Sequence, residues 1–274
     1  MNTKTIPTFM MLICLMINSG CNETRKAPMP ENTENTARPE ETGKTPDSEQ
    51  KNTASGVFFK GGGNEPFWNV ELAETGVTFT SLIEGYEALE TPLPEVVRAA
   101  DANVKRYRAV TEKTELILTI RQDSCADTMA DKKYGYRVTL DIKTGEDTGG
   151  QSLSGCGDYL MDQRLHDIWV LEQLGEETAK AEWFAKELPS MEINTNDRSF
   201  TGYAGCNQMH GKLFSERSLL RFTQVATTRK ACIPGNREGD FLQNLRNVTT
   251  WKIENNRLWL SNPEGMQLVF RKAD

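Results

Sequence analysis

The sequence predicts two small, mainly β domains, the second of them α+β, after a long unstructured N-terminal segment. From residue 57 onward, short runs of alternating apolar and polar residues recur with turn residues between them. This pattern is typical of antiparallel sheets and small barrels. The apolar spacing changes once to a helical period, near residue 240. Four cysteines fall in the predicted folded part, two in each half, so we expect each domain to be closed by one disulfide.

The first twenty residues have the pattern of an export signal. Lys4 is followed by an apolar run over 9–17, which is shorter than the roughly 20 residues of a membrane-spanning helix. Residues 18–21 then resemble a lipobox, although Asn18 stands where such motifs prefer Leu. We therefore expect residues 1–20 to be removed and Cys21 to carry diacylglycerol and an acyl chain such as palmitate, which together anchor stably. An ordinary secreted protein cut elsewhere is the alternative.

Residues 21–56 are predicted to be a disordered linker. They contain no aromatic residue and few apolar ones, so they cannot bury enough surface to offset the loss of conformational entropy. By resemblance to Gram-negative lipoproteins, Asn22 in place of Asp implies sorting to the outer membrane. We therefore expect the folded part to lie on the periplasmic face of that membrane.

The first domain is expected over residues 57–161. Glycines 61–63 are predicted to form a turn after the first strand. Successive residues of a strand face opposite sides, so Phe67 and Trp68 cannot both enter one core layer. One of them is expected to cover an interdomain face or form a binding patch, with plain core packing as the alternative. Strands are predicted at 57–60, 67–72, 76–82, 107–110, 115–120 and 136–142.

The second domain is expected over residues 165–272. Phe241, Leu242, Leu245 and Val248 lie at helical spacing, which predicts a helix over 237–247, with Asn236 as its N-cap. Strands are predicted at 168–171, 190–194, 199–203, 219–222, 250–253, 258–260 and 266–270.

The four remaining cysteines allow three pairings. The domain boundary near residue 162 selects Cys125 with Cys156 and Cys206 with Cys232. A metal site is the alternative, but no two cysteines have the Cys-x-x-Cys spacing of zinc ligands. We therefore expect disulfides and no metal.

The second domain resembles the META domain, the family of the heat-shock lipoprotein HslJ. The segments that carry the resemblance are Trp169–Leu171, Phe200–Asn207 with its Gly-Cys-Asn ending, Thr227–Cys232 and Leu258–Leu260. The resemblance implies a small curved sheet with one helix, and a role in envelope stress or drug tolerance. It brings no established catalytic residue.

The first domain resembles an uncharacterised lipoprotein domain that often accompanies META domains. The resemblance rests on Gly63–Trp68, on Cys125 with the residues that follow it, and on Gly155–Gly157.

Other candidate sites have simpler interpretations. The formal net charge of −7 argues against nucleic-acid binding. Asp123, Asp127 and Asp131 lack the glycine and glutamate of a calcium loop, which favours a solvated turn. His210 has no nucleophile or ligand cluster near it in the sequence, and Arg229 with Lys230 is interpreted as a solvated strand end rather than a small anion site.

We therefore expect a non-catalytic binding or stress-protection module of the cell envelope, without a cofactor, that is held to the membrane by its lipid. Its partner would be an unknown envelope protein or small molecule. The alternative is an inhibitor of an attacking hydrolase such as lysozyme, and an unrecognised enzyme is the third possibility. An enzyme would need convergent titratable groups in a pocket, and the sequence shows none.

Overall fold

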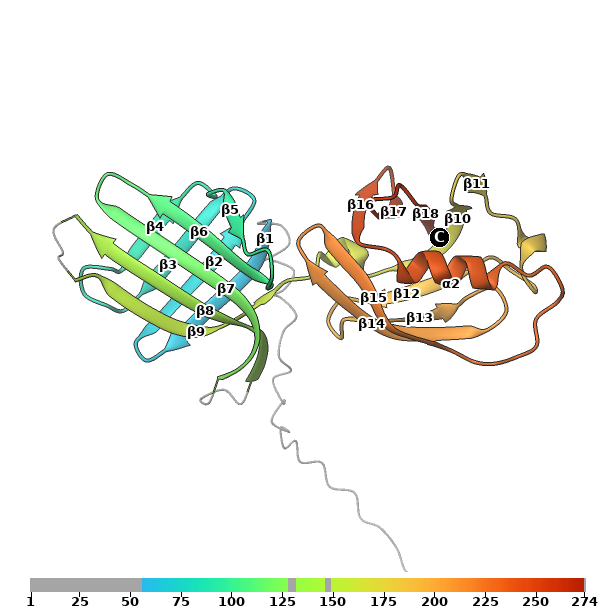
Figure 1. Ribbon diagram of the computed structural model, residues 1–274, viewed down its shortest axis with the longest axis horizontal. Coiled ribbons are helices and arrows are strands. Elements are labelled where there is room, and N and C mark those ends of the chain that lie inside the picture. The colour runs from blue at the N-terminus through green and yellow to red at the C-terminus, as the bar shows by residue number, and fades with distance from the viewer. Residues whose placement is uncertain (1–55, 128–131, 146–148, 274) are drawn as a thin grey trace, which may run out of the picture. The chain divides into compact units, whose positions relative to one another are not determined.

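The computed structural model describes residues 56–127, 132–145 and 149–273, and its strands form two nine-stranded sheets (Figure 1). Every strand pairing in the two sheets is antiparallel, and each sheet contains one disulfide-linked pair of cysteines. The predicted fold class is thereby confirmed. The predicted signal peptide, Cys21 and the linker up to residue 55 lie outside the described residues. No helix in the described ranges is long and apolar enough to cross a membrane.

The first sheet has the order β4-β3-β2-β1-β9-β8-β7-β6-β5. Its strands alternate in exposure, as a sheet with one buried face must. The buried side chains include Phe59, Trp68, Phe79, Leu118 and Val138, all of which are at most 1% exposed. The strands are β1 (Val57–Asn64), β2 (Phe67–Ala73), β3 (Gly76–Ser81), β4 (Ala88–Thr91), β5 (Val96–Arg98), β6 (Val104–Val110), β7 (Thr114–Asp127), β8 (Lys132–Thr144) and β9 (Gln151–Tyr159).

Glycines 61–63 do not form the predicted turn but lie inside β1. They are needed because neighbouring atoms come very close to this strand. A Cβ atom on Gly63 would lie 2.5 Å from Nε1 of Trp68, and one on Gly62 would lie 2.7 Å from the Trp68 carbonyl oxygen. On the paired strand β9, a Cβ atom on Gly155 would lie 2.0 Å from the Gly62 carbonyl oxygen. The two glycine-containing motifs are therefore facing parts of one tightly packed strand pair.

The second sheet has the order β11-β10-β12-β13-β14-β15-β16-β17-β18, and an additional β10–β18 pairing joins its ends into a ring. Two 3-10 helices, η1 (Gln163–Leu165) and η2 (Ala181–Trp183), accompany it. The strands are β10 (Ile168–Leu174), β11 (Glu177–Thr178), β12 (Ser190–Asn194), β13 (Ser199–Tyr203), β14 (Gln208–Glu216), β15 (Leu219–Thr227), β16 (Thr250–Glu254), β17 (Arg257–Ser261) and β18 (Gln267–Lys272).

The predicted helix is present as α2 (Glu238–Arg246), which packs on β15 and β18 through Phe241, Leu242 and Leu245. Its N-cap is Arg237 rather than the predicted Asn236. The Asn236 side chain nevertheless accepts a hydrogen bond of 2.9 Å from the backbone N–H of Glu238. Asn236, one position before the N-cap, thus binds one of the backbone N–H groups that have no partner within the helix.

The disulfides join Cys125 to Cys156 and Cys206 to Cys232, which confirms the predicted pairing. The first links β7 to β9 within the first sheet. The second links the turn before β14 to the loop after β15. Each disulfide therefore closes a loop within one sheet.

Candidate functional site

The hairpin of β14 and β15 ends in a two-residue turn formed by Arg217 and Ser218. Arg217 has a φ of 59°, in the left-handed region that such tight turns require. The described residues belong to one compact unit, and within it this hairpin tip contacts the first sheet. Two oppositely charged neighbours, Glu216 and Arg217, make those contacts.

Glu216 is buried and its carboxylate is fully engaged. It pairs with Lys105 Nζ at 2.6 Å, and it accepts hydrogen bonds from Asn103 Nδ2 at 2.7 Å and from Tyr136 Oη. Burial acts to raise the pKa of Glu216, but the hydrogen bonds from Lys105, Tyr136 and Asn103 outweigh it and hold the pKa below its usual value. Burial, followed by the bond to Glu216, raises the pKa of Tyr136, so this hydroxyl stays protonated and donates.

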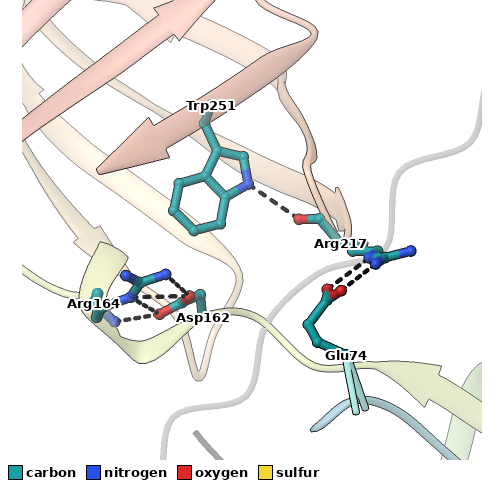
Figure 2. Close-up of polar contacts among 5 residues, drawn as sticks. All are labelled: Glu74, Asp162, Arg164, Arg217 and Trp251. Atoms are coloured by element: carbon teal, nitrogen blue, oxygen red, sulfur yellow. Dashed lines mark hydrogen bonds and ion pairs between the residues drawn. The ribbon is translucent and has the colours of Figure 1, made fainter. Parts of the chain in front are cut away.

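Arg217 makes three contacts of different kinds, and Figure 2 draws those with Glu74 and Trp251. Its guanidinium forms a bidentate ion pair with the carboxylate of Glu74, which lies on the turn after β2. The same guanidinium lies over the ring of Phe58, 4.8 Å from the ring centre. Its backbone carbonyl accepts a hydrogen bond of 3.2 Å from Nε1 of Trp251. Arg217 therefore contacts both the first sheet and the indole of Trp251 on β16.

A cleft of about 660 Å³ opens beside this tip, and we take it as the candidate site. Figure 2 shows the indole of Trp251 above two ion pairs, Glu74–Arg217 on one side and Asp162–Arg164 on the other, and all five residues line the cleft. Amide and hydroxyl groups of Gln163, Asn196, Thr195 and Ser218 also line the cleft. Its charged lining residues are Lys132, Arg164, Arg198, Arg217 and Lys252 against Glu74, Asp158 and Asp162.

The lining of the cleft has the groups that bind a polar ligand. The lining offers an aromatic ring, several hydrogen-bonding groups and an excess of positive charge. Neither histidine nor cysteine is among the lining residues in the described ranges. His166 lies just behind the lining, with Nδ1 3.5 Å from the Thr195 hydroxyl, but that hydroxyl donates its hydrogen bond to Gln163 at 2.8 Å. What the cleft can do is hold a polar ligand with a flat face.

The two residues of the predicted binding patch, Phe67 and Trp68, lie on opposite faces of β2. Trp68 is 1% exposed and belongs to the core, whereas Phe67 is 46% exposed. Phe67 lies beside Leu82, whose backbone N–H donates to the Phe67 carbonyl oxygen at 3.1 Å. Neither residue of the predicted pair lines the cleft around Trp251.

The three aspartates are not brought together as a cation loop in the described residues. Asp123 pairs with Arg121 and Arg137, and Asp127 accepts a hydrogen bond of 2.8 Å from Asn64. Asp131 lies outside the described residues. His210 is exposed on β14, and Arg229 and Lys230 are exposed in the loop after β15.

The Gly-Cys-Asn motif has a structural role. The buried Asn207 side chain accepts hydrogen bonds from the Lys230 backbone N–H and the Thr228 hydroxyl, and it donates to Glu238 on α2. Within the described ranges, the one group of three possible metal ligands is Cys206, Cys232 and Glu238. The two sulfurs are bonded to each other, so they are not available as thiolate ligands.

Sequence reasoning missed the residues at the hairpin tip. Glu74, Arg217 and Trp251 were not considered as site residues, and Trp251 is only half-buried. One signal was present in the sequence. Glu216, Arg217 and Ser218 stand between two runs of β pattern, which marks a turn but does not show what the turn contacts.

No curated protein matches the chain. Three solved structures are similar to about two fifths of it. One, described only as an NMR structure, is 22% identical over 41% of this chain and 94% of its own, with a TM-score of 0.34. An NMR structure from Burkholderia xenovorans is 25% identical over 40% and 86%, with a TM-score of 0.33. A crystal structure of a duf4847 family protein from Bacteroides vulgatus is 14% identical over 40% and 96%, with a TM-score of 0.28.

The family comparison identifies the second sheet unit. The resemblance of the first domain to an uncharacterised lipoprotein domain stays a prediction. The model of the META domain family matches residues 163–274, and this match confirms that the C-terminal part of the chain is a META domain.

Proposed function

We propose that this chain is a lipid-anchored periplasmic protein that binds its ligand without catalysis, in the cleft around Trp251, and helps the cell envelope to tolerate stress. The observation that carries the proposal is that the Trp251 indole and two ion pairs line the same cleft of about 660 Å³. Pockets of this size hold small molecules or short segments of larger ones.

The lining favours a saccharide that carries carboxylate groups. A flat indole can pack against the apolar face of a sugar ring. The side-chain amides and hydroxyls of Gln163, Asn196 and Thr195 can bond sugar hydroxyls, and Arg164 and Arg198 can pair with carboxylates. Cell-wall fragments have this chemistry and are present in the periplasm.

The test is calorimetric titration with a carboxylated muramyl disaccharide-peptide and, for comparison, a neutral chitin oligosaccharide. We expect the carboxylated ligand to bind more tightly, Trp251→Ala to abolish binding, and Trp251→Phe to retain part of it. Arg164→Gln should reduce the preference for the carboxylated ligand. The matched control is Trp183→Ala, because Trp183 is half-buried beside Arg237 and does not line the cleft. Binding that Trp251→Ala leaves unchanged would show that the ligand lies elsewhere.

The anchor has its own test. The intact mass of the protein extracted from membranes should correspond to a triacylated chain beginning at Cys21, with no free thiol and four thiols after reduction. Cys21→Ser should release the protein into the soluble fraction. An unlipidated wild-type protein would overturn the anchored localisation and leave the cleft proposal to be judged by titration.

The second candidate, an inhibitor of a hydrolase such as lysozyme, is favoured by one observation. Phe67 and Leu82 form an exposed apolar pair, with 46% and 81% of their surfaces accessible. Glu65 and Glu84 are exposed nearby in the chain, and such a tip could enter the cleft of a cationic enzyme. Lysozyme activity on cell walls should then fall with the wild-type protein and recover with Phe67→Ala. Val110→Ser, which changes an exposed apolar residue elsewhere, is the control.

A further inference from the structure

A second cleft, of about 930 Å³, lies beside the same hairpin tip. It shares only Arg217 and Ser218 with the cleft around Trp251. Strands β5, β6 and β9 of the first sheet and the β14–β15 hairpin of the second sheet all contribute to its lining. It is therefore a separate space with a different set of side chains.

The lining of the second cleft is strongly basic in a chain whose net charge is −7. Its charged residues are four cations, Arg98, Lys105, Arg217 and Arg221, and one carboxylate, Glu216. Lys105 is paired with Glu216, and Arg217 with Glu74. Within the part of the chain that the structure describes, Arg98 and Arg221 have no acidic partner. Two guanidinium groups in this cleft thus carry positive charge that the protein itself does not neutralise.

Two buried tyrosines add hydroxyl groups to the same cleft. Tyr107 and Tyr159 are 3% and 1% exposed. Burial raises the pKa of both, so their hydroxyls stay protonated at neutral pH. The charges of Arg217 and Arg98 act on the Tyr107 hydroxyl and oppose that rise in its pKa.

The Tyr159 hydroxyl is the second, independent sign of a ligand. It has no hydrogen-bond partner at normal bonding distance among the described residues, although the Tyr107 hydroxyl is near enough to affect its pKa. A buried hydroxyl without a partner is unfavourable, and a ligand acceptor in the cleft would remove that cost.

We propose that this cleft binds a phosphate monoester group, with Arg98 and Arg221 supplying the charge and Tyr159 supplying a hydroxyl donor. A phosphate monoester carries a charge of about −1.5 to −2 at pH 7 and presents three strong acceptor oxygens. This charge matches the two unneutralised arginines better than the charge of a single carboxylate does. Guanidinium groups also bind phosphate in a bidentate geometry. Leu213, Phe214 and Leu219 provide an apolar wall for the group that carries the phosphate.

The carrier can be a soluble molecule or a lipid headgroup, and two probes distinguish them. The protein is the full mature chain with Cys21→Ser, so that the proposed anchor does not itself bring the protein to a membrane. Glycerol 3-phosphate is titrated by calorimetry. Binding to phosphatidylcholine vesicles with and without phosphatidic acid is measured by sedimentation. Binding of glycerol 3-phosphate supports a soluble carrier, and binding only to the phosphatidic acid vesicles supports a lipid.

The variant Arg98→Gln with Arg221→Gln should weaken binding of the active probe about tenfold or more. Tyr159→Phe should weaken it less, and raising the salt concentration should weaken it further. The matched control is Arg229→Gln with Lys230→Gln, which removes the same charge from an exposed loop outside the cleft and should bind like the wild type. The proposal is overturned if neither probe binds the wild type, or if the cleft variant and the loop variant lose affinity equally.

Discussion

Glu216, at the end of β14 in the META domain, forms an ion pair of 2.6 Å with Lys105 on β6 of the first sheet. The two side chains are only 6% and 11% exposed, and Asn103 and Tyr136 also bond the carboxylate. A buried ion pair of this kind adds little net stability over an apolar pair, but it is costly to break by removing one partner. It therefore makes the contact of the hairpin tip specific.

The first prediction concerns this pair. Lys105→Met leaves the Glu216 carboxylate buried without its counter-ion, and we expect the free energy of unfolding to fall by about 3 kcal/mol. Combining it with Glu216→Gln should recover part of the loss, because the unpaired charge is then removed. Urea unfolding followed by tryptophan fluorescence measures both. Glu254→Gln, which breaks the exposed pair with Lys252, should leave the midpoint unchanged, since exposed pairs contribute little. Equal effects of Lys105→Met and Glu254→Gln would contradict the proposed role of burial.

The second prediction is a pH dependence that Glu216 carries. Its pKa in the folded protein lies below the ordinary 4.5. A lowered pKa contributes stability at pH values above 4.5, and that stability is lost as the pH falls through the lower, folded-state value. The difference in free energy of unfolding between wild type and Glu216→Gln should therefore narrow as the pH is lowered from 7 toward 3. Other paired carboxylates titrate in both proteins and cancel in this difference. Parallel pH profiles would show that Glu216 does not titrate as the structure indicates.

Much of the fold could be predicted because it depends on local patterns. Alternation predicted that Phe67 and Trp68 face opposite sides of β2, and helical spacing found α2. The strands β4, β5, β9, β11 and β14 were missed, and the two long ones among them are β9 and β14. Both contain glycine or charged residues at positions where the pattern expects apolar ones, for example Gly155 and Gly157 in β9. Those glycines are required because the backbones of the paired strands come very close to each other. The sequence of one strand does not indicate which strand pairs with it, so this requirement could not be predicted.

The clefts could not be predicted for a related reason. Glu216 and Lys105 are separated by 111 residues, and Glu74 and Arg217 by 143. Charged residues at turns are usually solvated, so nothing local distinguishes Glu216 from the exposed Glu254. The Glu216 carboxylate is buried because it contacts the first sheet, whereas the Glu254 carboxylate stays exposed to water.

The third prediction concerns the disulfides. Cys206–Cys232 closes a loop with a sequence separation of 26, and Cys125–Cys156 one of 31. In the chain-entropy model each contributes about 3.5 kcal/mol. The double variant Cys206→Ser with Cys232→Ser should have a lower melting temperature than the wild type. Complete reduction of the wild type should lower its melting temperature more than the double substitution does, because reduction opens both loops. Calorimetry with and without reductant measures these shifts. A wild-type protein whose melting temperature is insensitive to complete reduction would show that the loops add little.

The fourth prediction separates two glycines that look alike in the sequence. A Cβ atom on Gly155 would lie 2.0 Å from the Gly62 carbonyl oxygen, a backbone atom that cannot move without displacing β1. We expect Gly155→Ala to lower the free energy of unfolding by about 3 kcal/mol or to prevent folding. Gly239 lies in α2, and a Cβ atom there meets no atom within 4 Å. Gly239→Ala should instead raise the free energy of unfolding by about 0.5 kcal/mol, because alanine favours the helix. Urea unfolding of the two variants compares them directly. If Gly155→Ala were tolerated as well as Gly239→Ala, the close contact between β1 and β9 would be wrong, and with it the structural explanation of the two glycine-containing motifs.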